Sequence, residues 1–139
     1  MNINLGAVAA ASLAVCAVFI GSYAPSSAAP RTACAVLTGS QASAVAGSSV
    51  TTMARPSPIS AGSSICIYSA AGRPIAQLAL TVAANEAVAS QQFKMQQQVA
   101  AQHRNVANRQ KGNILISGIT MNGDTQLLNR LVDAATKNL

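Results

Sequence analysis

The sequence predicts a small α+β domain built on a mainly antiparallel sheet. Residues 75–82 alternate between apolar and polar side chains, which is typical of a strand with one face in water. The apolar side chains of residues 127–135 recur at helical spacing. The predicted elements run helix, strand, strand, helix, strand, helix, which favours a hairpin with covering helices over repeated strand–helix–strand units. We therefore expect a two-layer fold and no doubly wound parallel sheet.

The chain begins with an apolar segment that has the order of an export signal. Residues 1–29 contain no charged side chain, and the segment closes with Pro25 and the small residues Ser27-Ala28-Ala29. An apolar core followed by small residues is the pattern of a cleavable signal peptide. We predict a signal helix in residues 1–29, removed near Ala29, and a single secreted or periplasmic domain of residues 30–139.

A retained leader is the alternative. The apolar run of residues 3–24 is long enough to cross a bilayer as one helix and would then anchor the protein. Membrane contact by this route is expected only if the leader is not cleaved. Cys16 follows the bulky Val15 where a lipidation signal needs a small residue, so we do not expect a lipid anchor there.

The predicted domain starts with a short helix and a long loop. Thr38-Gly39-Ser40-Gln41 has the Thr-x-x-Gln form of a capping box, and Gly47 is a suitable helix terminator. Residues 47–64 are rich in Ser, Gly and Pro and show no periodicity. They predict a loop.

A hairpin follows the loop. Residues 65–68 are rich in β-branched and aromatic side chains and predict a strand. Residues 70–73 contain the glycine of a turn, and the alternating residues 75–82 complete the hairpin. One face of this second strand is polar, so we expect that face to contact water.

Asn85 predicts the start of a second helix that runs to about His103. Asn is a favoured N-cap, and Glu86 would lie near the positive end of the helix dipole. The helix has a narrow apolar stripe, and glutamines cover the rest of its surface. The stripe consists of Val88, Met95 and Val99, flanked by Ala89, Phe93 and Ala100.

The last strand and helix are predicted from turn and cap residues. Lys111-Gly112-Asn113 predicts a turn, and the apolar residues 114–121 that follow predict a third strand. Asn122-Gly123 ends this strand. Asp124 is placed to cap the final helix, whose apolar face was noted above.

Two cysteines, Cys34 and Cys66, fall in the predicted domain. An exported protein meets oxidising conditions, and Tyr68 and Phe93 are the only aromatic residues after the leader, so the core is small. We predict a disulfide, worth about 3–4 kcal/mol on the chain-entropy estimate. A two-thiol metal site and a reactive thiol are the alternatives. Zinc normally takes four ligands, however, and the chain has a single histidine.

The arrangement of these residues resembles a layout found in small exported bacterial domains. Cys34-Ala35-Val36-Leu37-Thr38, a short helix ending at Gly47, then Cys66-Ile67-Tyr68 and a glycine turn are similar to the "CALLT … CxY" layout of lipoprotein-like domains of unknown function. The resemblance implies an α+β fold and export, and it implies no catalytic residues. Such domains usually carry a further strand before the Lys-Gly turn. Residues 104–110 are short for it.

The sequence contains few residues that could support catalysis. The single histidine ends a glutamine-rich helix beside a basic residue, where a structural role is sufficient. Glu86 and Asp124 each begin a helix, and we expect Asp133 to pair with Arg130 or Lys137. No phosphate loop or metal-ligand spacing is present in the sequence. We therefore predict no catalytic residues, no cofactor and no metal site.

The positive charge of the chain serves either the solubility of an exported protein or the binding of an anionic partner. Nine basic residues against three acidic ones give a formal net charge of +6, which attracts anions. The densest basic segment contains Arg104, Arg109 and Lys111, our candidate residues for binding a partner. We expect an envelope protein, an anionic polymer or a lipid surface. We expect no specific nucleic acid, because no aromatic side chain lies near this segment to stack on bases.

These features favour a non-enzymatic exported binding or accessory protein of the cell envelope. A periplasmic inhibitor or immunity-type protein that inserts residues 47–64 into an enzyme cleft is one alternative. A small envelope hydrolase is the other. The sequence leaves the ligand and the oligomeric state open.

Overall fold

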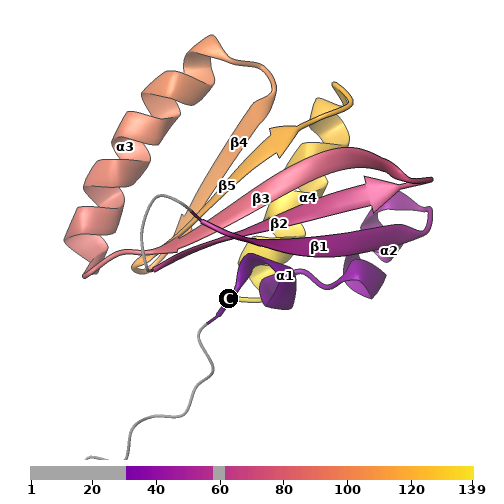
Figure 1. Ribbon diagram of the computed structural model, residues 1–139. Helices are drawn as coiled ribbons and strands as arrows, with labels where there is room; N and C mark the ends of the chain where they lie inside the picture. Colours follow the sequence, from indigo (N-terminus) through magenta and orange to yellow (C-terminus); the bar gives the residue numbers. More distant parts are fainter. Residues whose placement is uncertain (1–30, 58–61) are drawn as a thin grey trace, which may run out of the picture.

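The computed structural model describes residues 31–57 and 62–139, which form an α+β domain around a five-stranded antiparallel sheet (Figure 1). The strand order is β1-β2-β3-β5-β4, and every neighbouring pair is antiparallel. The predicted fold class is confirmed. The elements are α1 (Ala33–Val36), α2 (Gly39–Ala46), β1 (Val50–Pro56), β2 (Ser63–Ala70), β3 (Arg73–Val82), α3 (Glu86–Gln102), β4 (Val106–Lys111), β5 (Ile114–Thr120) and α4 (Thr125–Lys137). The predicted signal peptide lies outside the described residues.

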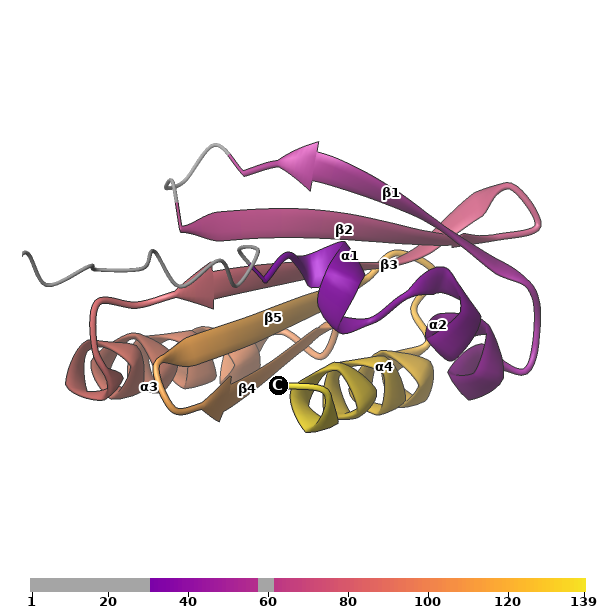
Figure 2. The same ribbon diagram turned by 90° about the horizontal axis from the view of Figure 1, so that it is seen from below.

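The main core lies between the sheet and the helices α1, α2 and α4. Figure 2 views the sheet from this side. α4 packs closely on β5, because a Cβ at Gly118 would lie 2.7 Å from Val132 and 2.8 Å from Leu128. Only glycine allows this approach without a shift of the helix. The apolar residues predicted for the last helix face this core: Leu127, Leu128, Leu131, Val132 and Ala135.

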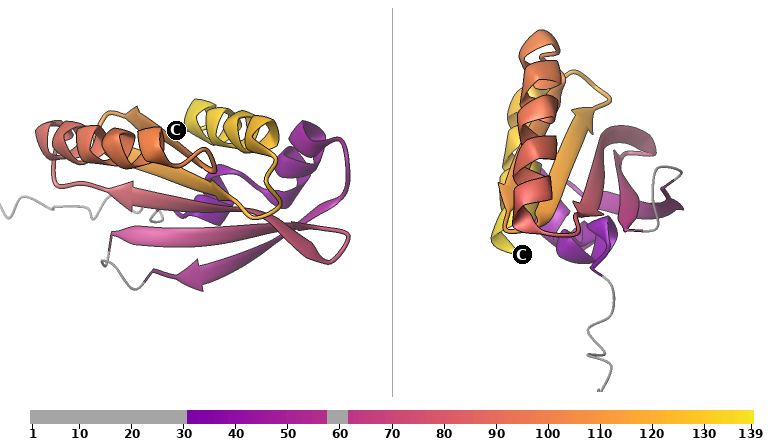
Figure 3. Two further views of the ribbon diagram at one scale, coloured as in Figure 1. Left: turned by 90° about the horizontal axis from the view of Figure 1, so that it is seen from above. Right: turned by 90° about the vertical axis from the view of Figure 1, so that its left-hand side faces the viewer.

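α3 lies on the opposite face of the sheet, beside β4 and β5 and away from β1 (Figure 3). Successive residues of a strand point to opposite faces. Gly118 faces α4, whereas Leu115 packs against Ala89 of α3 and Ala83 in a separate small core. The helices therefore cover both faces at the β4–β5 end of the sheet, an addition to the two predicted layers.

Local capping signals in the sequence predicted three helix starts correctly. Thr38 and Gln41 form the complete capping box of α2, and Gly47 ends that helix with a left-handed φ of 70°. The Asn85 side chain accepts a hydrogen bond from the Val88 N–H at 2.9 Å. Asp124 does the same for α4. These caps depend only on residues within one turn, which is why the sequence reveals them.

The prediction of a loop over residues 47–64 is wrong for its central part. Val50–Pro56 form β1, which pairs along its whole length with β2. Val50 is the only buried residue of β1, so no apolar alternation marks this strand in the sequence. The strand β1 forms because its backbone pairs with that of β2. Residues 58–61 lie outside the described part of the chain.

The expectation that residues 104–110 are too short for a further strand is wrong, because Val106–Lys111 form β4 at the other edge of the sheet. A turn of three residues is enough to connect α3 to β4. The sheet contact begins at once, because the backbone C=O of Asn105 already accepts a hydrogen bond from the Thr120 N–H at 3.0 Å. The four-residue helix α1 was not predicted either.

The predicted disulfide between Cys34 and Cys66 is confirmed, and it joins α1 to β2. Tyr68, two residues further along β2, is fully buried. Its hydroxyl donates to the carbonyl oxygen of Leu37 at 2.8 Å and lies 3.2 Å from that of Ala33. Burial raises the pKa of Tyr68 well above the ordinary value of a phenol. A covalent bond and a buried polar contact therefore fix α1 on the same face of the sheet.

Candidate functional site

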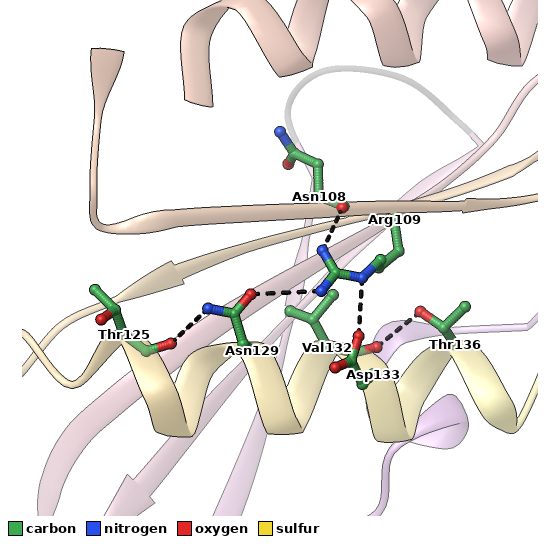
Figure 4. A network of polar contacts seen from close by, with 7 residues as sticks. All are labelled: Asn108, Arg109, Thr125, Asn129, Val132, Asp133 and Thr136. Atoms are coloured by element: carbon green, nitrogen blue, oxygen red, sulfur yellow. Dashed lines mark hydrogen bonds and ion pairs between the residues drawn. The ribbon is translucent and has the colours of Figure 1, made fainter. Parts of the chain in front are cut away.

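The main polar cluster lies where the second half of β4 runs beside α4 (Figure 4). The guanidinium of Arg109 crosses from the strand to the helix. Its Nε lies 2.8 Å from Asp133 Oδ1, and its second nitrogen lies 3.5 Å from Asn129 Oδ1. The third nitrogen donates to the backbone oxygen of Asn108 at 2.9 Å. Arg109 therefore links the edge strand to the outer face of α4.

Further cations surround this link. Arg109, Lys111, Asp133 and Lys137 line one shallow hollow of the surface, together with Thr136. Arg130, Asp133 and Lys137 line an adjoining one. We call Arg109, Lys111, Arg130 and Lys137 the cationic cluster. These four positive side chains lie around a single carboxylate, that of Asp133. The cluster therefore has a local excess of positive charge.

The α4 helix creates this surface by its periodicity. The residues that face the sheet are leucine, valine and alanine, whereas Asn129, Arg130, Asp133 and Lys137 are exposed. Residues three or four apart share one side of a helix. The three charged side chains of α4 therefore lie along one surface, next to the end of β4.

The structure separates the three predicted binding residues. Arg109 and Lys111 line the same hollow. Arg104 lies before β4 begins, seven residues from Lys111, and an extended chain of that length spans roughly 20 Å. Arg130 and Lys137 belong to the cluster, but we had not selected them. The sequence shows their helical spacing with Asp133, but it does not show that they lie close to β4.

Asp133 does not pair as predicted. We expected Arg130 or Lys137, its neighbours on the helix, but the ion pair is formed with Arg109. Both partners remain partly exposed, at 38% and 49% of the side chain. Within residues 31–57 and 62–139 no second ion pair is found, so Lys111, Arg130 and Lys137 have no acidic partner there.

The groups that could support catalysis are dispersed. Glu86 and His103 lie at opposite ends of α3, about 25 Å apart at 1.5 Å per residue. The carboxylate of Asp124 accepts the Leu127 N–H at 2.8 Å and so acts as a helix cap. In the part of the chain that the structure describes, no three His, Cys, Asp or Glu residues are grouped to hold a metal ion.

α3 contacts the sheet through polar groups as well as through its small apolar core. Asn108 is 4% exposed, and its Nδ2 donates to the Gln96 carbonyl oxygen at 3.1 Å. Ser117 donates to Gln96 Oε1 at 3.1 Å. The Oδ1 atom of Asn108 has no hydrogen-bond partner among the described residues. Gln96 therefore faces the sheet, although we expected the glutamines to cover the solvent side.

The apolar stripe predicted for α3 is not the surface through which the helix packs on the sheet. Val88, Met95 and Val99 are 37%, 56% and 54% exposed. The helix instead packs through the neighbouring face that contains Ala89 and Phe93, which had been assigned to the flank of the stripe. The bonds to Gln96 fix this rotation about the helix axis.

None of the described helices is long and apolar enough to cross a membrane. Comparison with protein-family models, curated proteins and solved structures found no match. The cationic cluster is therefore interpreted from its own residues.

Proposed function

We propose that this protein is a non-enzymatic, exported binding or accessory protein of the cell envelope, and that its cationic cluster contacts an anionic partner. The partner is an acidic protein, an anionic polymer or a lipid surface. The observation that carries the proposal is the gathering of Arg109, Lys111, Arg130 and Lys137 around a single carboxylate.

The geometry of the cluster supports binding over a merely solvated surface. Arg109 neutralises Asp133, because the two side chains are in direct contact. Lys111, Arg130 and Lys137 then add their charges to one side of the molecule, and all three are exposed. Like charges brought together on a fixed scaffold create a local potential that attracts anions and raises their rate of encounter.

The disulfide supports export. Cys34 and Cys66 are bonded in the folded domain, and such bonds persist in oxidising compartments such as the periplasm or the extracellular space. A signal peptide in residues 1–29 would deliver the chain there.

Retention on immobilised heparin and on phosphatidylglycerol vesicles tests the proposal. In the first variant, Lys111, Arg130 and Lys137 are each replaced by Gln. In the matched control, Arg73, Lys94 and Arg104 are replaced by Gln, which removes the same charge from exposed positions outside the cluster. We expect the first variant to elute at clearly lower salt than the control. Equal elution of the two variants would contradict the proposal.

The two arms of this test separate the partners. Loss on heparin alone indicates a polymer, and loss on vesicles as well indicates a lipid surface. Loss on neither matrix is the equal elution that contradicts the proposal.

An inhibitor or immunity-type function is the second candidate, and the exposure of β1 favours it. Every residue of β1 after Val50 is exposed, and an extended exposed strand can pair with the edge of an enzyme cleft. Pull-down from envelope extract, with and without substitution of Thr52 by Pro, tests this function. An enzyme captured by the unaltered protein alone would support it.

A further inference from the structure

α3 has an apolar side that is left exposed in the described part of the chain. Val88, Met95 and Val99 remain open to solvent, because Ala89 and Phe93 make the contact with the sheet instead. The proposed function does not use this side, since the cationic cluster lies on β4 and α4. An exposed apolar surface on a folded protein marks an interaction site.

The exposed residues recur at the spacing of a coiled coil. Val88 and Met95 are seven residues apart, and Gln92 and Val99 each follow one of them by four residues. Steps of four, three and four residues are those of the a and d positions, which meet between two helices that lie side by side. We call Val88, Gln92, Met95 and Val99 the α3 seam. Such a seam is buried only when a second helix lies against it.

The α3 seam points along the sheet, from β4 towards β3. The opposite side of the helix lies at the outer edge of the sheet. There Ser90 accepts a hydrogen bond from the Gln110 side chain of β4 at 3.0 Å, and Gln97 lines a hollow beside that strand. With 3.6 residues per turn, the seam is about 180° away from Ser90 and Gln97. No described helix covers β1–β3 on this face of the sheet, so a second helix can reach the seam (Figure 3).

We infer that a second copy of this chain packs its own α3 against the seam, in parallel, with a twofold axis between the two helices. The fold selects this axis. An axis along the helices places the second sheet on the far side of the helix pair, whereas an axis perpendicular to the sheet would place both sheets in the same space. The layers of the dimer are therefore sheet, helix pair and sheet, with each α4 on the outside.

Gln92 makes the seam suited to an identical helix. Equivalent residues meet across the twofold axis of a parallel pair, so the two Gln92 side chains lie together. A carboxamide has both donors and an acceptor, so one amide donates to the carbonyl oxygen of the other. An apolar helix from another protein would bury this amide without a partner, which is unfavourable. A single polar residue at an a position also fixes the register of the pair.

The seam contains no charged residue. Glu86 and Lys94 are the ionisable residues of α3, and both fall at outer positions of the heptad. Each copy has a formal net charge of +6, which opposes association at long range. An uncharged surface is where two such copies approach at least cost. Added salt should strengthen the pair, because it screens the repulsion between the copies.

The surface is large enough for a stable dimer. α3 has 17 residues and is about 25 Å long, and the uncovered face of β1–β3 is about 10 Å wide. Each α3 would contact the second helix on one side and the second copy's sheet on another, and Met53 and Ile119 on the sheet face would be covered as well. Each copy would then bury roughly 750 Å², close to the value of about 800 Å² per partner in a standard interface.

The dimer would have a consequence that rests on the proposed function. α3 and α4 cover opposite faces of the sheet, so pairing through α3 leaves both cationic clusters on outer surfaces that point away from each other. One dimer would then join two anionic chains or surfaces. The pairing itself rests on the α3 seam and does not depend on the proposed function.

Sedimentation equilibrium of the purified protein tests the inference. We expect a mass of two chains that falls to one in Met95→Lys, because the axis would place the two lysines in contact within the seam. Gln97→Lys is the matched control, since it adds the same charge to an exposed position on the opposite side of the same helix. It should remain dimeric. A single-chain mass for the unaltered protein at about 1 mM, where even millimolar affinity half-populates a dimer, would overturn the inference. A dimer unaffected by Met95→Lys would do so as well.

The salt dependence separates this inference from the proposed function. The dimer should become tighter as the salt concentration rises, whereas retention on heparin by the cationic cluster should become weaker. A dimer that dissociates on addition of salt would contradict pairing through an uncharged seam. Loss of heparin retention in the cluster variants would leave the dimer unaffected.

A cross-linking experiment tests the parallel orientation. In a Cys16→Ser background, Val88→Cys should form an interchain disulfide, because equivalent seam residues face each other across the axis. In an antiparallel pair centred on α3 the two cysteines would lie about 18 Å apart along the helices. Gln97→Cys, on the far side of the helix, should not cross-link. Equal cross-linking of both variants, or of neither, would contradict the arrangement.

Discussion

α3 and α4 cover opposite faces of the same sheet, and they are attached in different ways. α4 has 13 residues and buries five apolar side chains in the main core. α3 has 17 residues, yet Ala89 is its only fully buried one. Both have a side-chain N-cap. Length and capping are therefore not what attaches a helix here, and the difference comes from the apolar area each removes from water.

The same comparison holds for charge. The outer surface of α4 contributes Arg130 and Lys137 to the cationic cluster, with Asp133 bound by Arg109. Lys94 is the only basic residue within α3. The face that contains most of the core also presents the candidate binding surface, so loss of α4 packing should remove stability and binding together.

Replacement of Leu131 by Ala should have the largest effect on stability. Leu131 is fully buried between α4 and the sheet, and such truncations cost about 2–5 kcal/mol. Phe93 on α3 is only partly buried, so Phe93→Ala should cost about 1 kcal/mol despite the larger side chain. Urea unfolding of both variants measures the difference. Equal losses would show that α3 is attached as firmly as α4.

Removal of the disulfide should come next. Cys34 and Cys66 replaced together by Ala should lower the free energy of unfolding by about 3–4 kcal/mol on the chain-entropy estimate. The effect should be largest in α1 and least in α3, because the bond joins α1 to β2. Hydrogen exchange of the variant measures this distribution. Faster exchange confined to α3 would contradict the role assigned to the bond.

Tyr68→Phe should have an intermediate effect and alter the pH dependence. The substitution leaves the carbonyl oxygen of Leu37 buried without its donor, at a cost of about 1–3 kcal/mol. Burial raises the pKa of Tyr68, so in the unaltered protein the unfolded state loses its proton first as the pH rises. The contribution is complete below about pH 10 and is lost above it. Unfolding free energies from pH 8 to 11 should fall less steeply in the variant than in the unaltered protein.

The Arg109–Asp133 pair should contribute least to stability. Both side chains are partly exposed, and exposed pairs are worth less than about 1 kcal/mol. A double-mutant cycle with Arg109→Gln and Asp133→Asn measures the coupling. A coupling above about 2 kcal/mol would show that the contact between β4 and α4 is structural rather than part of a binding surface.

The contrast between the helices also explains what the sequence could reveal. Caps at Thr38, Asn85 and Asp124 were predictable because each depends on residues within one turn. The stripe of α4 was predictable because most of its apolar residues face one core. The edge strands β1 and β4 were not, since their side chains are mostly exposed or polar and pairing with β2 and β5 creates them.

The candidate site was partly predictable for the same reason. Local charge density identified Arg109 and Lys111, which are close in sequence. Arg109 and Asp133 are 24 residues apart, so their contact depends on the packing of α4 beside β4. Arg130 and Lys137 join the cluster only through that packing.

The most direct test of the account is an NMR titration of the protein with a heparin-derived oligosaccharide at low salt. We predict amide shifts at the end of β4 and along α4, centred on Lys111, Arg130 and Lys137, with none along Val88–Val99 of α3. Shifts centred on α3 or on β1, or no shifts at all, would contradict the assignment of the binding surface to the α4 side.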